Sequence, residues 1–223
     1  MYESRSNTVR EFVCGQIVGT IAPVAGGYVA ALRDGFFLLQ SDGGLRRPVR
    51  APHDPAQYRF NDGKADPRGR LWVGTLSLTG MKCTSALYCW EPGAELKPML
   101  GGISISNGIA WSADGRRMYY IDSPTRLVRE FAFDEERGTI GSGRTVVACT
   151  EADGLPDGCA LDVDGNVWVA HWGGSQVTQT DPRTGRVVRR VAVAVRNVPR
   201  AHLVDRGWTS CSFQRHARRR RTE

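Results

Sequence analysis

Short runs of apolar residues, separated by turns rich in glycine, aspartate and proline, recur along most of the chain. The clearest example is residues 58–75, where a strand with a polar start is followed by a Pro-Arg-Gly turn and a second strand at 71–74. Runs of this length between turn residues predict β-strands. A helix start, a helical period and a helix stop coincide nowhere. We therefore expect an all-β protein.

The same plan occurs four times. The glycines that open each copy are spaced by 44, 45 and 50 residues, and the aromatic anchors Tyr28, Trp72, Tyr119 and Trp168 by 44, 47 and 49. Strand-rich repeats of this period predict a β-propeller with about four full blades, each of about four short strands, plus fragments. The last strands that we can place in the copies are 34–39, 85–90, 126–133 and 175–180.

The ends of the chain fit this repeat less well. By alternation, residues 8–13 predict one strand, and a proline-rich connection runs from 48 to 55. Past residue 197 the pattern deteriorates: 199–208 matches no blade element, and 209–213 predicts one more inner strand. We divide the chain into an incomplete single-domain propeller, 1–198, and a divergent arginine-rich segment, 199–223.

The net charge of +7 belongs to the C-terminal end. Residues 183–223 carry a net charge of +10, which leaves the rest of the chain at −3. A solvated tail is favoured over a nucleic-acid patch, because no aromatic residues interrupt the arginine run 218–221.

Composition narrows the class further. Apolar residues make up 41% of the chain, which is enough for a core, and no apolar run is long enough to cross a bilayer. The first twelve residues hold no hydrophobic segment, so we expect neither a secretory signal nor a membrane partner. Six cysteines without a C-x-x-C pair predict free thiols in a reducing, cytoplasmic compartment.

Candidate chemistry lies just before the repeat glycines, where Val18, Asp62, Asn107 and Asp157 occupy equivalent positions. The first strand of each propeller blade lines the central channel, so the three polar side chains should converge at the axis. Carboxylate and amide oxygens suit a hard divalent cation. The alternative is that each Asx-Gly pair only makes a tight turn.

Three further residues are weaker candidates. Arg59 and Asn61 could bind a polar substrate or could be satisfied turn residues, and for His171 a packed or solvent-facing side chain is favoured over a catalytic one. No G-x-S-x-G, Walker A or H-E-x-x-H motif is present.

Four motifs together resemble the SMP-30/gluconolactonase/regucalcin-like family of sugar lactonases. They are RFNDGK (59–64), DPRGRLWVGT (66–75), SNGIAWSADGRRMYYIDS (106–123) and PDGCALDVDGNVWVAHW (156–172), and the resemblance covers about residues 7–197. It implies a six-bladed propeller that hydrolyses a sugar lactone with one divalent metal ion. Ca²⁺ is the first choice, with Zn²⁺, Mn²⁺ or Mg²⁺ as alternatives.

The resemblance also implies roles for single residues. Asn107 and Asp157 correspond to metal ligands, and Arg59 and Asn61 to contacts with the sugar. The cation would polarise the lactone carbonyl, and Asp157 would accept a proton from the attacking water. The implied reaction is hydrolysis of an aldonolactone, such as a glucono-, xylono- or arabinono-lactone, to the aldonic acid.

The chain also departs from the family. The glutamate ligand that the resemblance implies belongs to the inner strand of the blade preceding Gly19; we expect the sequence to start too late to contain it, and Glu3 and Glu11 lie in the wrong context. Ser77 and Thr79 stand where a substrate-contacting carboxylate is expected. Three alternatives follow: an impaired propeller that binds calcium or sugar, an arginine tail that binds nucleic acid, and a homo-oligomer that covers open blade edges.

Overall fold

The computed structural model describes residues 2–3, 8–9, 13–24, 27–40, 44–203 and 211–213. These residues form strands almost throughout, with two single-turn 3-10 helices, η1 (Ser123–Thr125) and η2 (Glu151–Asp153). None of the helices in the described ranges is long and apolar enough to cross a membrane.

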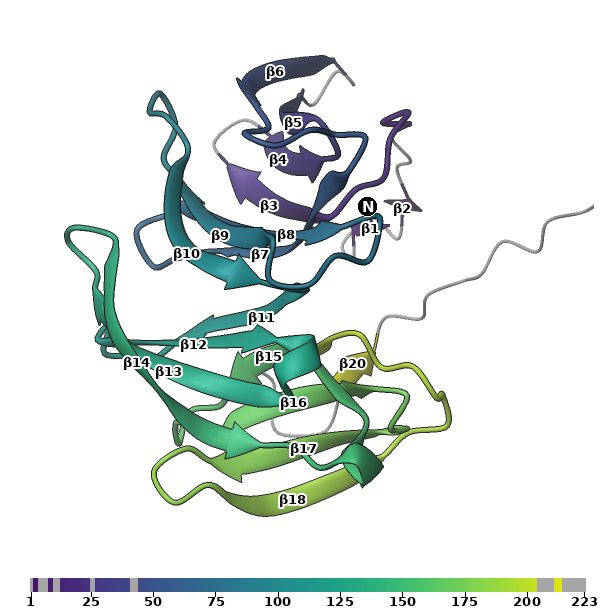
Figure 1. Ribbon diagram of the computed structural model, residues 1–223, viewed down its shortest axis with the longest axis vertical. Coiled ribbons are helices and arrows are strands. Elements are labelled where there is room, and N and C mark those ends of the chain that lie inside the picture. Colours follow the sequence, from purple (N-terminus) through teal and green to yellow (C-terminus); the bar gives the residue numbers. More distant parts are fainter. Residues whose placement is uncertain are drawn as a thin grey trace, which may run out of the picture.

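Sixteen of the strands form four antiparallel sheets, in each of which the four strands follow one another in chain order (Figure 1). The first sheet contains β3 (Thr20–Val24), β4 (Gly27–Leu32), β5 (Gly35–Gln40) and β6 (Leu45–Arg50). The second contains β7 (Tyr58–Ala65), β8 (Leu71–Ser77), β9 (Ser85–Trp90) and β10 (Lys97–Ile103). The third contains β11 (Ser106–Trp111), β12 (Arg117–Asp122), β13 (Leu127–Asp134) and β14 (Thr139–Ala148). The fourth contains β15 (Leu155–Leu161), β16 (Val167–Trp172), β17 (Gln176–Asp181) and β18 (Arg186–Ala192).

The first strands of the four sheets lie side by side. Strand β7 packs between β3 and β11, and β11 packs against β15 (Figure 1). Each sheet is therefore one blade whose first strand faces the centre. The prediction of an all-β propeller is confirmed, and the four four-stranded sheets agree with the four full blades expected, while the total of six blades stays a prediction.

Aromatic anchors and turn aspartates hold the blades together. The Trp72 indole donates its N–H to the Asp66 carboxylate at 3.0 Å, and the Trp168 indole donates to Asp162 at 2.8 Å. Both pairs are six residues apart, so the same turn closes the second and the fourth blade. Apolar layers fill the space between neighbouring sheets: Trp72, Met118 and Phe131 between the second and third, and Tyr119, Val147 and Val167 between the third and fourth.

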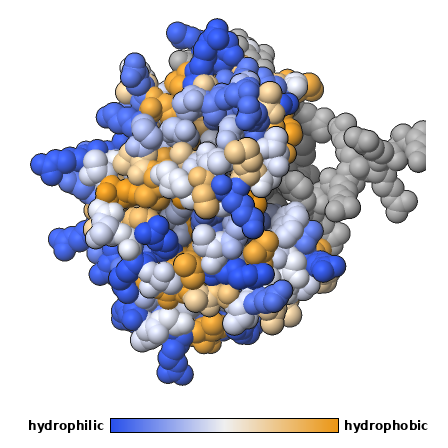
Figure 2. All heavy atoms as spheres, in the orientation of Figure 1, coloured by the Kyte–Doolittle hydropathy of each residue, from blue (hydrophilic) through white to orange (hydrophobic). Residues whose placement is uncertain are grey.

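The sequence analysis did not identify the outermost strands β6, β10, β14 and β18. Strand β18 is exposed along nearly its whole length, so no face of it shows the alternation that identifies a half-buried strand. On the face drawn in Figure 2, hydrophilic and hydrophobic residues are interspersed. The predicted connection beginning at Pro48 was partly wrong, because Pro48 lies within β6. Among the described strands, β6 bonds only to β5, with a register shift, and such an edge tolerates proline.

Two-stranded sheets lie at either end of the described chain. Strand β1 (Tyr2–Glu3) pairs with β2 (Thr8–Val9), and β19 (Ala201–Leu203) pairs with β20 (Cys211–Phe213). The prediction of no blade element in 199–208 was wrong at β19, and β19 rather than the predicted strand 209–213 packs beside β15. Residues 10–12, 204–210 and 214–223 lie outside the described part, and the domain boundary at 198 stays a prediction.

Candidate functional site

The polar residues of the inner strands lie at β-bulges. The register between the first and second strands of a blade shifts around residues 61–62 in β7, 107–108 in β11 and 157–158 in β15. A bulge leaves a residue out of the ladder and re-aims its side chain. The three Asx-Gly pairs are therefore parts of strands rather than tight turns between them.

Glycine at these bulges lets adjacent inner strands approach closely. A β-carbon on Gly108 would lie 2.7 Å from the Asp157 carbonyl oxygen, and one on Gly158 would lie 2.7 Å from the Pro199 carbonyl oxygen. Contacts this short do not occur at real β-carbons, so a side chain at either position would push the next strand away. The glycines thus fix how near Asn107 and Asp157 stand to each other.

The four site residues predicted from the sequence line a single cavity. Arg59, Asn61, Asn107 and Asp157 all border a cavity of about 490 Å³, which we call the axial cavity. They come from three different blades, and the bulged ends of β7, β11 and β15 bring them together. Other residues along its wall are Val18, Asp62, Leu76, Ser123, Trp172 and Arg200.

A chain of hydrogen bonds orients the amides on this wall. Arg59 Nη1 donates to Asn61 Oδ1 at 2.8 Å, and Asn61 Nδ2 donates to Asn107 Oδ1 at 2.8 Å. Asn107 Nδ2 then donates to Ser123 Oγ at 2.7 Å, and this hydroxyl donates to the Pro156 carbonyl at 2.6 Å. The amide of Asn107, which is only 8% exposed, is therefore held with its oxygen toward Asn61.

Ser123 is one functional residue that the sequence did not reveal. It begins η1 directly after β12, and its hydroxyl links β11 to β15 through Asn107 and Pro156. The available signal was its place as the last residue of the 106–123 motif, where it reads as an ordinary turn residue.

The Asp157 carboxylate receives no hydrogen bond from any residue that the structure describes. Burial raises its pKa to about 8, with a further contribution from the negative charge of Asp62, while the positive charge of Arg200 acts in the opposite direction. Near neutral pH this carboxyl can hold or release a proton. It is also a poorly compensated negative charge that a cation would stabilise.

Asp62 and Arg200 form an ion pair on the same wall. Asp62 Oδ1 accepts the backbone N–H of Gly63 at 2.9 Å and also pairs with Arg200 Nη2. The expected convergence of Asp62, Asn107 and Asp157 on one cavity is thus observed, together with an unexpected guanidinium. Sequence analysis placed Arg200 in the divergent segment, and a single arginine among many gave no signal of its position.

The donor set fits a hard divalent cation. Asn107 Oδ1 and the carboxylates of Asp62 and Asp157 are all oxygen donors, the kind that Ca²⁺ and Mg²⁺ prefer. The Arg200 guanidinium already pairs with Asp62, whereas the Asp157 carboxylate has no ion-pair partner among the described residues. Val18, at the equivalent position of the first blade, has no side-chain oxygen to offer, and within the described ranges no three His, Cys, Asp or Glu side chains form a metal-binding group.

His171 lies apart from the axial cavity. It is buried, 1% exposed, and its Nε2 is 2.8 Å from Thr178 Oγ1. Burial lowers its pKa to about 4, so the ring is neutral at physiological pH. This environment agrees with the packed histidine favoured from the sequence. Four of the cysteines in the described ranges are free thiols: Cys83, Cys89, Cys149 and Cys159.

A second cavity, of about 610 Å³, lies along the other halves of the inner strands, and we call it the far cavity. Small apolar side chains such as Ala22, Ala110 and Ala160 form much of its wall. Asp62 and Arg200 border both cavities, so their ion pair lies between the two.

Known proteins place this chain in a family. A family model described as SMP-30/Gluconolactonase/LRE-like region matches residues 1–203. The putative sugar lactone lactonase YvrE of Bacillus subtilis is 34% identical over 171 residues, covering 76% of this chain and 59% of that protein.

Solved structures agree with that match. A luciferin-regenerating enzyme is 30% identical with a TM-score of 0.83, covering 90% of this chain and 70% of that one. The calcium-binding protein regucalcin from Agrobacterium tumefaciens is 26% identical with a TM-score of 0.78, covering 83% and 63%. The chain spans 60% and 59% of the length of the first curated relatives it matches. From the bulged inner strands, the four motifs and these matches, the chain belongs to the SMP-30/gluconolactonase/LRE-like family.

Proposed function

We propose that this chain hydrolyses a sugar aldonolactone to the aldonic acid. The reaction would use one divalent cation, with Ca²⁺ as the first choice, held by Asn107 and Asp157. The observation that carries the proposal is the Asp157 carboxyl. It lies at the edge of a cavity, has no hydrogen-bond donor in the described part of the chain, and has a pKa raised to about 8. The name of the Bacillus relative supports the substrate class, and that of the Agrobacterium protein supports a calcium site.

Asn107 and Asp157 would hold the cation through the amide oxygen and the carboxylate. When bound, a divalent cation supplies Lewis acidity that polarises a carbonyl and makes nearby water more acidic. It would also lower the pKa of Asp157 below its present value, because an adjacent positive charge favours the carboxylate.

The remaining steps fall to side chains. Arg59 forms no ion pair among the described residues, and its Nη1 donates to the Phe60 carbonyl and to Asn61, so the other guanidinium N–H groups remain available for sugar hydroxyls. Asp157 accepts a proton from water as the water oxygen attacks the lactone carbonyl carbon. The ester bond to the ring oxygen then breaks, and the proton returned by Asp157 completes the new hydroxyl group.

The test is proton release from glucono-, xylono- and arabinono-lactone by the purified chain, corrected for spontaneous hydrolysis. We expect EDTA to stop turnover and Ca²⁺ to restore it, and Asp157→Asn to abolish it. Asp164→Asn is the matched control, since Asp164 is an exposed turn residue. Full activity in EDTA or in Asp157→Asn would contradict the proposal.

A second candidate is a calcium- and sugar-binding module without turnover. The observation that favours it is Val18, an apolar residue on the cavity wall at the first-blade position equivalent to Asp62, Asn107 and Asp157. Calorimetric binding of Ca²⁺ and of a lactone without proton release would support the module, whereas turnover would contradict it.

The other predicted partners stay untested. The arginine run 218–221 lies outside the described residues, and deletion of 214–223 followed by a salt-dependent nucleic-acid binding assay would test it. Sedimentation of the purified chain would test the predicted homo-oligomer.

A further inference from the structure

We propose that Arg200 is a tethered cation that competes with the divalent cation for the carboxylates of the axial cavity and so weakens metal binding. This inference rests on the proposed cation site and adds a residue of this chain that limits it. It predicts that removing the Arg200 charge tightens the site.

The backbone at Arg200 is fixed against the candidate ligands. Gly158 donates its N–H to the Pro199 carbonyl at 2.9 Å, which joins this segment to β15 beside Asp157. A β-carbon on Gly158 would lie 3.0 Å from Arg200 Cα and 3.3 Å from its Cγ. The Arg200 backbone therefore lies beside Gly158, the residue that follows Asp157, and the Arg200 side chain lies along the cavity wall.

The guanidinium already uses one of the carboxylates there. Arg200 Nη2 pairs with Asp62 Oδ1, and the two side chains are only 28% and 14% exposed. The only other hydrogen bond to Asp62 in the described part of the chain comes from the Gly63 backbone. Arg200 thus neutralises most of the charge that Asp62 would otherwise offer to a cation between itself and Asp157.

Electrostatics then sets the sign of the effect. A guanidinium cannot lose its proton in a protein, so its charge persists at every accessible pH. A divalent cation near Asn107 and Asp157 would be repelled by this charge, and repulsion is stronger in a partly buried site than in water. Binding of the cation must therefore either tolerate the repulsion or displace Arg200 from Asp62.

The experiment is calorimetric titration of the full chain with CaCl₂. We expect Arg200→Met to bind Ca²⁺ roughly tenfold or more tightly than the wild type, because one repelling charge is gone. Arg200→Lys keeps the charge and should bind close to the wild-type value. Arg196→Met is the matched control: it removes an exposed arginine from the same segment, away from the cavity, and should leave the affinity unchanged.

A second neutral variant separates the loss of the Arg200 charge from an effect of misfolding. Arg200→Gln keeps a hydrogen-bond donor for Asp62 without the charge, and it should show the same gain as Arg200→Met with an unchanged circular dichroism spectrum. Equal or weaker Ca²⁺ binding in both neutral variants would overturn the role of Arg200 and leave the cation site standing. If the wild type and both neutral variants all fail to bind Ca²⁺, the role of Arg200 is overturned together with the cation site.

Discussion

Asp66 and Asp157 are the same residue type, and each borders a cavity, yet their surroundings are opposite. Asp66 accepts hydrogen bonds from the backbone N–H groups of Arg68 and Arg70, from Arg70 Nε at 2.6 Å and from the Trp72 indole. The Asp157 carboxylate, at the axial cavity, has no donor among the described residues. The carboxylate of Asp66 has no bonding capacity left, whereas the unbonded, half-buried carboxylate of Asp157 can still bind a ligand.

The two cavities differ in the same way as these two aspartates. The far cavity is the larger, and Lys64 and Asp66 line it besides the shared pair of Asp62 and Arg200, but its buried carboxylate, Asp66, is satisfied. The axial cavity is smaller and gathers two amides, a second arginine and an unbonded carboxylate. A polar group with bonding capacity left, rather than volume, identifies the candidate site.

The strongest test of this difference between the two cavities is to remove an oxygen from the axial cavity. Asn107→Leu keeps the branched shape of the side chain but removes the amide oxygen, so we expect lactone turnover to fall by at least about 100-fold. Lys64→Met, on the wall of the far cavity, should leave the rate within about twofold, a margin smaller than any loss of a positioned acid or base. Steady-state proton release measures both, and similar losses in the two variants would erase the distinction between the cavities.

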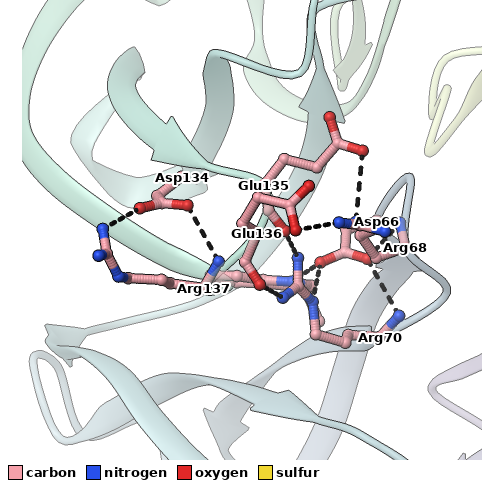
Figure 3. Close-up of polar contacts among 8 residues, drawn as sticks. Asp66, Arg68, Arg70, Asp134, Glu135, Glu136 and Arg137 are labelled. Carbon is pink, nitrogen blue, oxygen red and sulfur yellow. Dashed lines mark hydrogen bonds and ion pairs between the residues drawn. The ribbon is translucent and has the colours of Figure 1, made fainter.

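The structural role of Asp66 predicts a loss of stability instead. Figure 3 shows Arg70 between Asp66 and the turn of the neighbouring blade, where its guanidinium donates to the Glu135 and Glu136 carbonyls. Asp66→Asn would leave the 8% exposed Arg70 without its counter-ion and lower the free energy of unfolding by about 3 kcal/mol. Urea unfolding measures the change, with Asp164→Asn as the exposed control. A change below about 1 kcal/mol, the value of a surface ion pair, would contradict a structural role for Asp66.

His171 is an intermediate case, since Nε2 is bonded and Nδ1 has no partner. Its pKa is about 4 in the folded chain and near its ordinary value in the unfolded chain, so below pH 6.5 the unfolded state takes up the proton first. The stabilisation is complete above pH 6.5 and is lost as the pH falls toward 4.

We therefore expect the wild type to lose on the order of 2 kcal/mol more stability than His171→Gln between pH 7 and pH 5, because the raised pKa of Asp157, which acts in the opposite direction, is common to both proteins. Urea unfolding at the two pH values gives the difference. Parallel pH dependence in wild type and variant would show that this ring does not contribute.

The smallest effect is expected on the surface beside Asp66. Arg68 pairs with Glu136 and, at 3.8 Å, with Glu135, but the Arg68 side chain is 47% exposed. Arg68→Met should cost less than about 0.5 kcal/mol. A loss as large as that of Asp66→Asn in urea unfolding would mean that the network in Figure 3 acts as one unit.

The sequence predicted what repeats and what is buried. The first two strands of each blade carry a glycine and an aromatic anchor at a nearly constant phase, and in three blades a polar residue precedes the glycine. The order of these strands and the grouping of Arg59, Asn61, Asn107 and Asp157 were therefore accessible. Outer strands such as β18 face solvent and carry no such pattern.

Two features of the site could not be predicted in the same way. The bulges depend on register between strands, which a single chain does not display, and the Asp62–Arg200 pair joins residues 138 apart with no repeat to announce it. The role of Asp66 was also missed, because a turn aspartate looks the same whether its carboxylate is exposed or bonded to Trp72 and Arg70.

The close approach at Gly108 and Gly158 has a consequence for how such a protein can change. Because each glycine fits the backbone of the following inner strand, a blade exchanged for a homologous one must match its neighbour at the axis as well as in the apolar layer between sheets. The exposed outer strands impose no such match. Recombination and insertion are therefore tolerated most easily at the periphery, and the axis is inherited as a unit that spans several blades.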